Sequence, residues 1–388
     1  MKRILFFLAA LAVLAVLTGC TAAPTPPTTE APPVTTEPPT EPEPVLVPMS
    51  LSELQGLVKG LTTDDTTVTY LNMGKADPHR ADAAIRADRY LTTLQSFAWE
   101  PFDTSIQGKA DLTPQCTLSG DGFSMTAYRN FYVTDARPVY VATDTTGGWF
   151  QLKTIEETED TPAQVPGMLF DLFNSWYEEA AFAELHQNGG TPITADELDW
   201  FQAFTTSEEC HYDEDDDHVW IGATAISCFF TSRYDDPRDM DANAFLEYCP
   251  PEKILDAADE EEFRLVQEKL DWRTSDGELL TITEFPFPCR RLSRAYINEI
   301  LTQYAGLTVE EMHTDWLEAA FYVPATDCFY VFTSDFGPGT FAPCYGEHTG
   351  DTVTLWESPH ANDGKTSDVL ILQKTNDQWH ILSHQAAE

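Results

Sequence analysis

Apolar and polar residues follow two different periods along this chain. In one set of segments apolar residues recur every three or four positions, which is the spacing of a helix that buries one face. In another set apolar and polar residues alternate one by one, which is the spacing of a half-buried strand. Within residues 49–187 these periods predict helices at 50–61, 77–98 and 169–188, and strands at 66–71, 123–127, 131–134, 139–143 and 149–152.

Local signals mark the ends of the first two helices. Ser50 is followed three residues later by Glu53, which is the spacing of a capping box. Asp77 and Pro78 predict the start of the second helix, because Asp caps a helix well and proline is tolerated in the first turn.

Residues 188–388 place helices first and strands second. Three turn signals, at Gly337, Gly350 and Asn376-Asp377, predict hairpins that join the strands into one antiparallel meander. The expected fold class is therefore α+β, with two domains, 49–187 and 188–388, each of helices packed on an antiparallel sheet. The expected helices are 194–204, 241–248, 260–270 and 293–304, and the expected strands are 320–323, 328–333, 340–345, 352–356, 369–374 and 379–383.

The first 48 residues follow neither period. A positive start is followed by an apolar run at 4–17, which is shorter than the roughly 20 residues that a membrane-spanning helix needs. Leu17-Thr18-Gly19-Cys20 then resembles the lipobox of bacterial lipoproteins. The resemblance implies a signal peptide at 1–19, lipid on the Cys20 sulfur, and an extracytoplasmic protein that is anchored to the membrane through this lipid. The alternative is a short transmembrane anchor.

Residues 20–48 are expected to form a tether behind the lipidated cysteine. Ten of the 26 prolines of the chain fall here. Proline fixes φ and removes a hydrogen-bond donor, so the segment favours extended structure over helix or sheet.

The excess of acidic residues limits the kinds of partner that the chain can bind. The chain has 64 acidic and 22 basic residues, and its formal net charge is −42. Such a chain repels nucleic acid, which is therefore not an expected partner. The bland interpretation is a solvated, self-repelling surface.

The acidic run at 208–217 is the candidate metal site. Asp213, Asp215 and Asp217 imitate the opening of an EF-hand loop, and His211 and His218 flank them. The imitation then fails, because His218 stands at the glycine position of such a loop. These five residues are weak candidates for metal ligands, and the alternative is that they form a solvated acidic loop. No cofactor is expected.

Seven cysteines remain once Cys20 is assigned to lipid. The chain has no C-x-x-C, which leaves zinc-ribbon and thioredoxin-like sites without support. Cys328 and Cys344 are equally distant from Phe336, so a hairpin turn there would place them opposite each other and allow a disulfide. The alternative is that all seven are isolated buried thiols.

A resemblance covers roughly residues 190–388. Residues 229–239, followed by Phe245 and Leu246, and residues 330–335 with the strands after them resemble segments of uncharacterised lipoproteins of clostridial gut bacteria. The resemblance implies a lipoprotein and assigns no activity and no catalytic residue.

Two functions remain open. The motifs of serine hydrolases, acylating enzymes and HExxH metalloproteases are absent from the sequence, so no catalytic residue is assigned. The first hypothesis is a non-catalytic cell-surface lipoprotein that binds a cell-wall polymer, a glycan or an envelope protein. The alternative is an envelope hydrolase with an acidic site that acts on glycan or peptidoglycan. Nine tryptophans could stack on sugars, although Trp149, Trp176 and Trp379 lie in periodic segments and are expected in the core.

Overall fold

A computed structural model describes most of the chain after residue 45. The described residues are 46–72, 75–104, 112–130, 137–158, 161–185, 189–213, 218–319, 321–332, 337, 339–357 and 368–387. The expected signal peptide, Cys20 and most of the expected tether lie outside them, as does the strand expected at 131–134. Contacts divide the chain into Met1–Pro44 and Val45–Glu388. The expected boundary at 187/188 falls inside the second unit, so a split into two domains is not confirmed.

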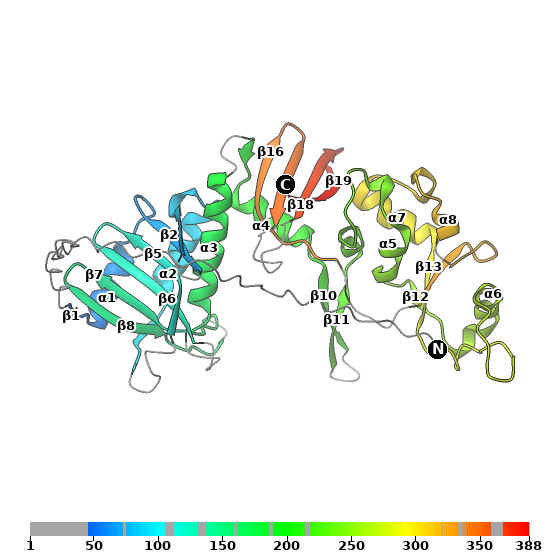
Figure 1. Cartoon of the computed structure of the whole chain (residues 1–388), viewed down its shortest axis with the longest axis horizontal. Helices are drawn as coiled ribbons and strands as arrows, with labels where there is room; N and C mark the ends of the chain where they lie inside the picture. Colours follow the sequence, from blue (N-terminus) through cyan, green and yellow to red (C-terminus); the bar gives the residue numbers. More distant parts are fainter. Residues whose placement is uncertain are drawn as a thin grey trace, which may run out of the picture. The chain divides into compact units, whose positions relative to one another are not determined.

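An eight-stranded sheet forms first along the chain (Figure 1). Its order is β1-β8-β7-β6-β5-β2-β3, and β4 pairs with β8. Every pair is antiparallel except the parallel pair of β1 and β8. The strands are β1 (Val47–Pro48), β2 (Thr67–Asn72), β3 (Lys75–Arg80), β4 (Trp99–Pro101), β5 (Leu112–Gly120), β6 (Phe123–Asn130), β7 (Val139–Thr143) and β8 (Thr146–Leu152).

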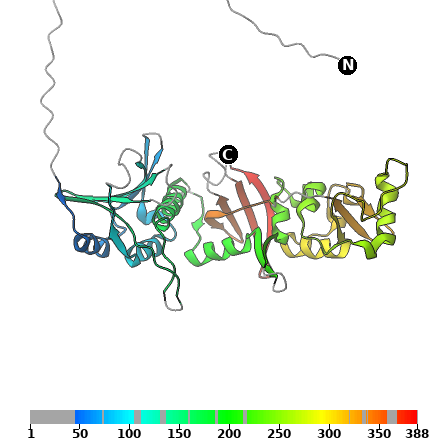
Figure 2. The same ribbon diagram turned by 90° about the horizontal axis from the view of Figure 1, so that it is seen from below.

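Three helices, α1 (Leu51–Gly60), α2 (Ala87–Ser96) and α3 (Met168–Leu185), pack against one face of this sheet. Figure 2 shows α1 and α2 on the same side of it. The apolar face expected for α3 is confirmed, because Phe173 and Trp176 are fully buried in the cluster that holds the inward-facing residues of the strands. The capping box expected at the start of α1 is also present. Helices on antiparallel strands confirm the α+β class.

The helix start expected at Asp77 and Pro78 is wrong. Both residues belong to β3, where they lie opposite Tyr70 and Thr69 of β2. Strand β3 is at the edge of the sheet, and an edge strand tolerates proline because one of its sides needs no donor. The helix itself begins ten residues later than its expected start.

The last residues of the expected tether belong to the sheet, although the proline-rich composition of residues 20–48 predicts neither helix nor sheet. The N–H of Val47 donates to the carbonyl of Thr145, and the N–H of Met49 donates to that of Gly147, both at 2.9 Å. Pro48 lies between these two donors. Since only alternate residues bond across a strand pair, the missing N–H of proline costs nothing here.

The later strands form two sheets and a separate hairpin. The single meander expected from the sequence is therefore wrong. The four-stranded sheet has the order β12 (Lys253–Ile254), β13 (Cys289–Ser293), β15 (Cys328–Phe332), β14 (Phe321–Val323). The five-stranded sheet has the order β19 (Gln378–Ala386), β18 (Asp368–Thr375), β17 (Thr352–Glu357), β16 (Pro343–Thr349), β9 (Thr191–Pro192), and the hairpin pairs β10 (Glu208–Asp213) with β11 (His218–Ala223).

The expected meander is divided between two sheets because of the path of the chain between β15 and β16. A Cβ atom at Gly339 would come within 2.3 Å of the backbone of Phe230. The glycine therefore lets the chain pass closely over another segment on its way to the second sheet, where a turn was expected. Five helices accompany these sheets: α4 (Ala195–Phe204), α5 (Ala242–Tyr248), α6 (Glu260–Leu270), α7 (Arg294–Ala305) and α8 (Trp316–Ala319).

Helix α7 ends at a glycine whose replacement we expect to be costly. Gly306 has φ = 66°, and a Cβ atom there would lie 2.9 Å from Nδ1 of His380. We expect Gly306→Ala to lower the free energy of unfolding by about 1–2 kcal/mol, measured by urea denaturation. The matched control is Gly56→Ala inside α1, where the Cβ would meet no atom within 4 Å and which should raise stability by about 0.5–1 kcal/mol. Equal stability of Gly306→Ala and the wild type would contradict the expectation.

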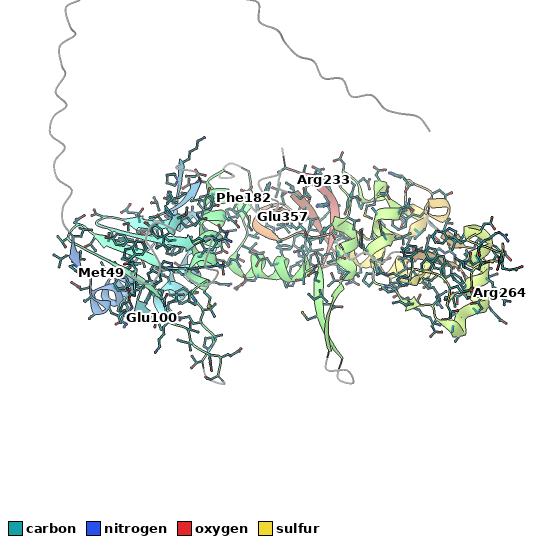
Figure 3. The ribbon with its side chains drawn as sticks, turned by 60° about the horizontal axis from the view of Figure 1, so that its bottom comes forward. Met49, Glu100, Phe182, Arg233, Arg264 and Glu357 are labelled. Atoms are coloured by element: carbon teal, nitrogen blue, oxygen red, sulfur yellow. The ribbon has the colours of Figure 1, made fainter. Side chains whose placement is uncertain are left out.

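The first residue of β18, Asp368, lies between a guanidinium and an imidazole. Oδ1 of Asp368 accepts hydrogen bonds from Nη2 and Nε of Arg233 at 2.6 and 3.0 Å (Arg233 is labelled in Figure 3). Nε2 of the buried His384 lies 3.2 Å from Oδ2, while its Nδ1 donates to the carbonyl of Ser232 at 2.8 Å. Burial alone would raise the pKa of Asp368, but the hydrogen bonds from His384 and Arg233 outweigh it and the pKa is lowered.

This lowered pKa gives a pH dependence of stability. The unfolded chain binds the proton of Asp368 near the ordinary value of about 3.9, whereas the folded chain binds it only at lower pH. The carboxylate therefore contributes stability above that value and loses it as the pH falls through the folded pKa. We expect Asp368→Asn to flatten the fall of the urea midpoint below about pH 4, and Asp377→Asn, at a fully exposed side chain, to leave it unchanged. Identical slopes for Asp368→Asn and the wild type would rule this out.

Candidate functional site

The face of the eight-stranded sheet opposite the helices carries a cluster of aromatic rings. On β6, Met125 and Ala127 are buried toward the helices, so the residues between and after them face the other way. The strand register places Thr126 opposite Tyr140 and Tyr140 opposite Trp149. Three neighbouring strands therefore present Tyr128, Tyr140 and Trp149 on one face.

Trp149 is the centre of this cluster. Its ring centroid lies 4.8 Å from that of Tyr128 and 5.0 Å from that of Tyr140, with interplanar angles of 56° and 51°. Phe102, which follows β4, extends the cluster at 6.5 Å. These distances and tilts are in the range that aromatic pairs prefer. All four side chains are partly exposed, so part of each ring remains open to solvent.

A glycine makes room for one of the rings. A Cβ atom at Gly147 would lie 2.5 Å from the hydroxyl of Tyr140 and 3.0 Å from Cδ1 of Leu46. The absence of a side chain at Gly147 therefore lets the Tyr140 phenol extend across β8. Burial, and then the neighbouring Tyr140, raise the pKa of Tyr128, so its phenol is a neutral hydrogen-bond donor at neutral pH.

Hydroxyl groups continue the face beside the rings. Thr126 lies opposite Thr117 of β5, and their Oγ1 atoms are 2.9 Å apart. Farther along the sheet, the hydroxyls of Ser119 and Thr67 are 3.1 Å apart. On the other side of the cluster, the side-chain amide of Gln151 donates to Glu100 of β4 at 2.6 Å; Figure 3 labels Glu100. The face thus combines apolar rings with polar groups that can fix a ligand's orientation.

A cavity beside α3 is the second candidate. It measures about 170 Å³, and Arg86, Tyr90, Glu179 and Gln202 contribute to its lining. Oε1 of Glu179 accepts from Nε of Arg86 at 2.6 Å and from the hydroxyl of Tyr90, and Oε2 accepts from the Arg86 backbone N–H at 3.0 Å. Burial raises the pKa of Glu179, and the Arg86 guanidinium opposes this rise.

This arrangement favours a structural role for Glu179. Both of its oxygens are engaged, and Arg86 continues to Asp199 of α4 at 3.0 Å, so the ion pair ties three helices together. A glycosidase needs two carboxyl groups on opposite sides of a bound sugar, one of them free to donate its proton. The cavity is also smaller than the roughly 300–1,000 Å³ of usual ligand sites.

Two other exposed tryptophans lie elsewhere. Trp200 is 48% exposed and stacks on Phe204, with ring centroids 5.2 Å apart. Trp272 is 42% exposed and packs 5.0 Å from Phe285. Each places one exposed indole against phenylalanine rings, so they are the natural comparison for Trp149.

The metal candidates fall at the tip of the β10–β11 hairpin. His211 and Asp213 belong to β10 and His218 to β11, with Asp213 opposite His218, while Asp215 and Asp217 lie outside the described residues. Among the side chains that the structure describes, no group of three or more His, Cys, Asp and Glu could hold a metal ion. The metal site therefore stays a prediction.

The hairpin that would have joined Cys328 to Cys344 does not form. Cys328 is on β15 and Cys344 on β16, and these strands belong to different sheets. Both thiols are free and buried. Cys328 lies against Tyr330 and the other residues of its own cluster, while Cys344 packs with Phe182 in another.

Sequence reasoning also misplaced Trp149 and missed its two tyrosines. Trp149 was expected in the core, but the core residue at that point of β8 is its neighbour Phe150. The signal that could have found the cluster is the alternation itself. Tyr140 stands between the apolar Val139 and Val141, so it had to face away from them.

Within the described part of the chain, none of the helices is long and apolar enough to cross a membrane. The chain matches no protein-family model, and no similar protein was found among the curated proteins or the solved structures.

Proposed function

We propose that this chain is a non-catalytic binding protein of the cell envelope, held to the outside of the membrane by lipid on Cys20, and that it binds an uncharged glycan through the face around Trp149. The observation that carries the binding role is the cluster of Tyr128, Tyr140 and Trp149 on three adjacent strands. Rings of this kind offer large apolar contact to the C–H faces of sugars. The Thr117 and Thr126 hydroxyls beside them can bond to sugar hydroxyls.

The charge of the chain favours an uncharged polymer. A formal net charge of −42 repels anionic wall polymers at a distance. Stacking and hydrogen bonds to neutral sugars do not depend on that charge. A binding face of rings and hydroxyls is therefore better suited to a neutral glycan than to a charged chain.

Cosedimentation tests this proposal. The purified chain is mixed with insoluble peptidoglycan and with insoluble uncharged polysaccharides, at low and high salt. We expect it to pellet with at least one uncharged glycan, to be released by soluble fragments of the same glycan, and to change little with salt, because screening weakens mainly charge contacts. A chain that stays in the supernatant with every polymer would contradict the glycan-binding role. Binding that disappears at high salt would instead indicate a cationic partner.

The anchor is tested separately. Cells that express the chain with its own leader are labelled with palmitate, and Cys20→Ala should remove the label because it removes the acylated sulfur. The matched control is Cys210→Ala, at an exposed free cysteine, which should keep the label. Equal labelling of Cys20→Ala and the wild type would remove the anchor from the proposal.

The alternative is an envelope hydrolase, and the observation in its favour is Glu179, a carboxyl group with a raised pKa beside a cavity. Its test is the release of reducing ends from peptidoglycan or from the bound glycan. Release that is lost in Glu179→Gln, at unchanged binding, would favour the enzyme. We expect no release of reducing ends, because the Glu179 carboxylate already accepts hydrogen bonds from Arg86 and Tyr90.

A further inference from the structure

Two cysteines that are distant from each other in the sequence meet in the core. Cys228 lies in the 3-10 helix η3 (Ala225–Phe230), and Cys249 caps the end of α5, where its N–H donates to the carbonyl of Leu246 at 3.3 Å. The side chains are 1% and 0% exposed and belong to the same hydrophobic cluster.

The two elements that carry them pack directly on each other. Phe229, the neighbour of Cys228, meets Phe245 edge to face, with ring centroids 5.1 Å apart. Phe245 and Cys249 are four residues apart at the end of one helix, so they lie on the same side of it. That side faces η3. Burial raises the pKa of Cys249, and the neighbouring thiol of Cys228 raises it further, so the two thiols lie next to each other.

Three other cysteines that the structure describes, Cys289, Cys328 and Cys344, do not have this arrangement. Cys289 and Cys328 lie on paired strands, but the register sets Cys289 opposite Phe332 and Cys328 opposite Ser293, at the two ends of the pair. Cys344 is in a different sheet from both of these residues.

We propose that Cys228 and Cys249 form a disulfide when the chain folds in an oxidising compartment. The oxidant is a small-molecule or protein disulfide. One cysteine, as its thiolate, attacks a sulfur of the oxidant and releases one of its thiols. The second cysteine, as its thiolate, then attacks the mixed disulfide and releases the other. Two protons leave the cysteines and two electrons pass to the oxidant, which becomes a dithiol or two thiols.

The burial of both thiols determines the stage of folding at which the disulfide can form. A reagent cannot reach sulfurs that are 0–1% exposed, so the bond must form before the cluster closes. Once formed, it fixes η3 to the end of α5 and closes the chain between them into a loop, which restricts the unfolded state. The disulfide requires a compartment outside the cytoplasm, where disulfides persist. In the cell it therefore rests on the extracytoplasmic location of the proposed function.

Refolding tests the pairing without reference to location. The full chain is reduced, unfolded, and refolded in a mixture of reduced and oxidised glutathione. Remaining thiols are then alkylated in denaturant, and trypsin cuts after Arg233 and Arg238, between the two cysteines. We expect mass spectrometry to find the Cys228 and Cys249 peptides joined, and the urea midpoint to be higher than that of the reduced chain. The tryptic peptide 154–233 carries Cys210 as well as Cys228, so the join should persist in Cys210→Ala and vanish in both Cys228→Ala and Cys249→Ala. Alkylation of both residues in the refolded wild type, or their linkage to other cysteines, would overturn the proposal.

The same measurement on the chain from cells separates the pairing from the location. The chain is expressed with its own leader, and its thiols are blocked at harvest. A joined pair supports both the disulfide and the exported address. A pair that joins on refolding but is free in cells still supports the pairing, and it overturns the export on which the proposed function rests.

Discussion

Trp149→Ala is expected to raise the dissociation constant for the glycan by about 30-fold or more. Trp149 contacts both Tyr128 and Tyr140, at 4.8 and 5.0 Å, so its removal takes away the centre of the proposed face and leaves the two phenols without mutual support. Tryptophans at the centre of an interface commonly contribute 2 kcal/mol or more, and each 1.4 kcal/mol is a factor of ten in affinity. The measurement is calorimetric titration with soluble fragments of whichever polymer the chain pellets with.

Trp272→Ala and Trp200→Ala are the matched controls, since both remove an indole that is more than 40% exposed. Both should bind as the wild type does. Because Trp149 lies on the face away from the buried cluster, its variant should keep the circular dichroism and thermal midpoint of the wild type within a few degrees. Full binding by Trp149→Ala, together with a loss in Trp272→Ala or Trp200→Ala, would move the site to another part of the chain.

A finer change at the same face is Gly147→Ala. Its methyl group would lie 2.5 Å from the present position of the Tyr140 hydroxyl, so the phenol must move. We expect weaker binding with no ring removed. This outcome would show that the placement of Tyr140, and not only the presence of rings, matters for the glycan.

Arg86→Met is expected to lower the free energy of unfolding by about 3–5 kcal/mol, the largest effect on stability that we expect from a single substitution. The variant leaves the Glu179 carboxylate, whose side chain is 1% exposed, without its cation. The substitution leaves one charge buried without a partner. Methionine keeps most of the apolar stem of the arginine, so the loss reflects the charge and not the packing. Urea denaturation at pH 7 measures the loss.

The pH dependence of this loss follows from the direction of the pKa shift. Burial raises the pKa of Glu179, and Arg86 opposes the rise, so the carboxyl group of the variant takes up a proton more readily. The neutral form is less costly to bury. The loss should therefore be smaller at pH 5 than at pH 7, because protonation removes the stranded charge at the lower pH.

Arg89→Met is the control for this substitution. Arg89 pairs with Asp196 and Asp199, but its side chain is 45% exposed, and exposed ion pairs contribute about 1 kcal/mol or less. The double variant Arg86→Met/Glu179→Leu should recover most of the stability, because an apolar pair of similar volume often replaces a buried ion pair at little cost. Similar losses in Arg86→Met and Arg89→Met would contradict the burial argument.

Elements with strong local signals could be predicted from the sequence. The capping box at Ser50, the expected helix start at Thr194 and the glycine after α7 mark helix ends through backbone hydrogen bonds and φ, which depend on neighbouring residues alone. The inward face of α3 follows from its period. Their bounds agree with expectation to within one or two residues at these ends.

What failed depended on distant partners. Asp77 and Pro78 have the local chemistry of a helix start, and only the pairing of β3 with β2 makes them a strand. The strands on either side of Gly339 were assigned to one meander, because nothing local shows that this residue passes over Phe230. The rings around Trp149 could be placed on one face by alternation, but their meeting required the register of three strands. The proximity of Cys228 and Cys249 likewise depends on packing between η3 and α5, which has no sequence signature.

The parallel pairing of β1 with β8 has a mechanical consequence. A pull on the chain ahead of Leu46 reaches the sheet first at β1, which is held by hydrogen bonds that include those from Val47 to Thr145 and from Met49 to Gly147. Strand β8 also carries Trp149. A load between the N-terminal end and a ligand on the aromatic face would thus pass through one strand, and the short β1 would peel away before the rest of the sheet bore the force.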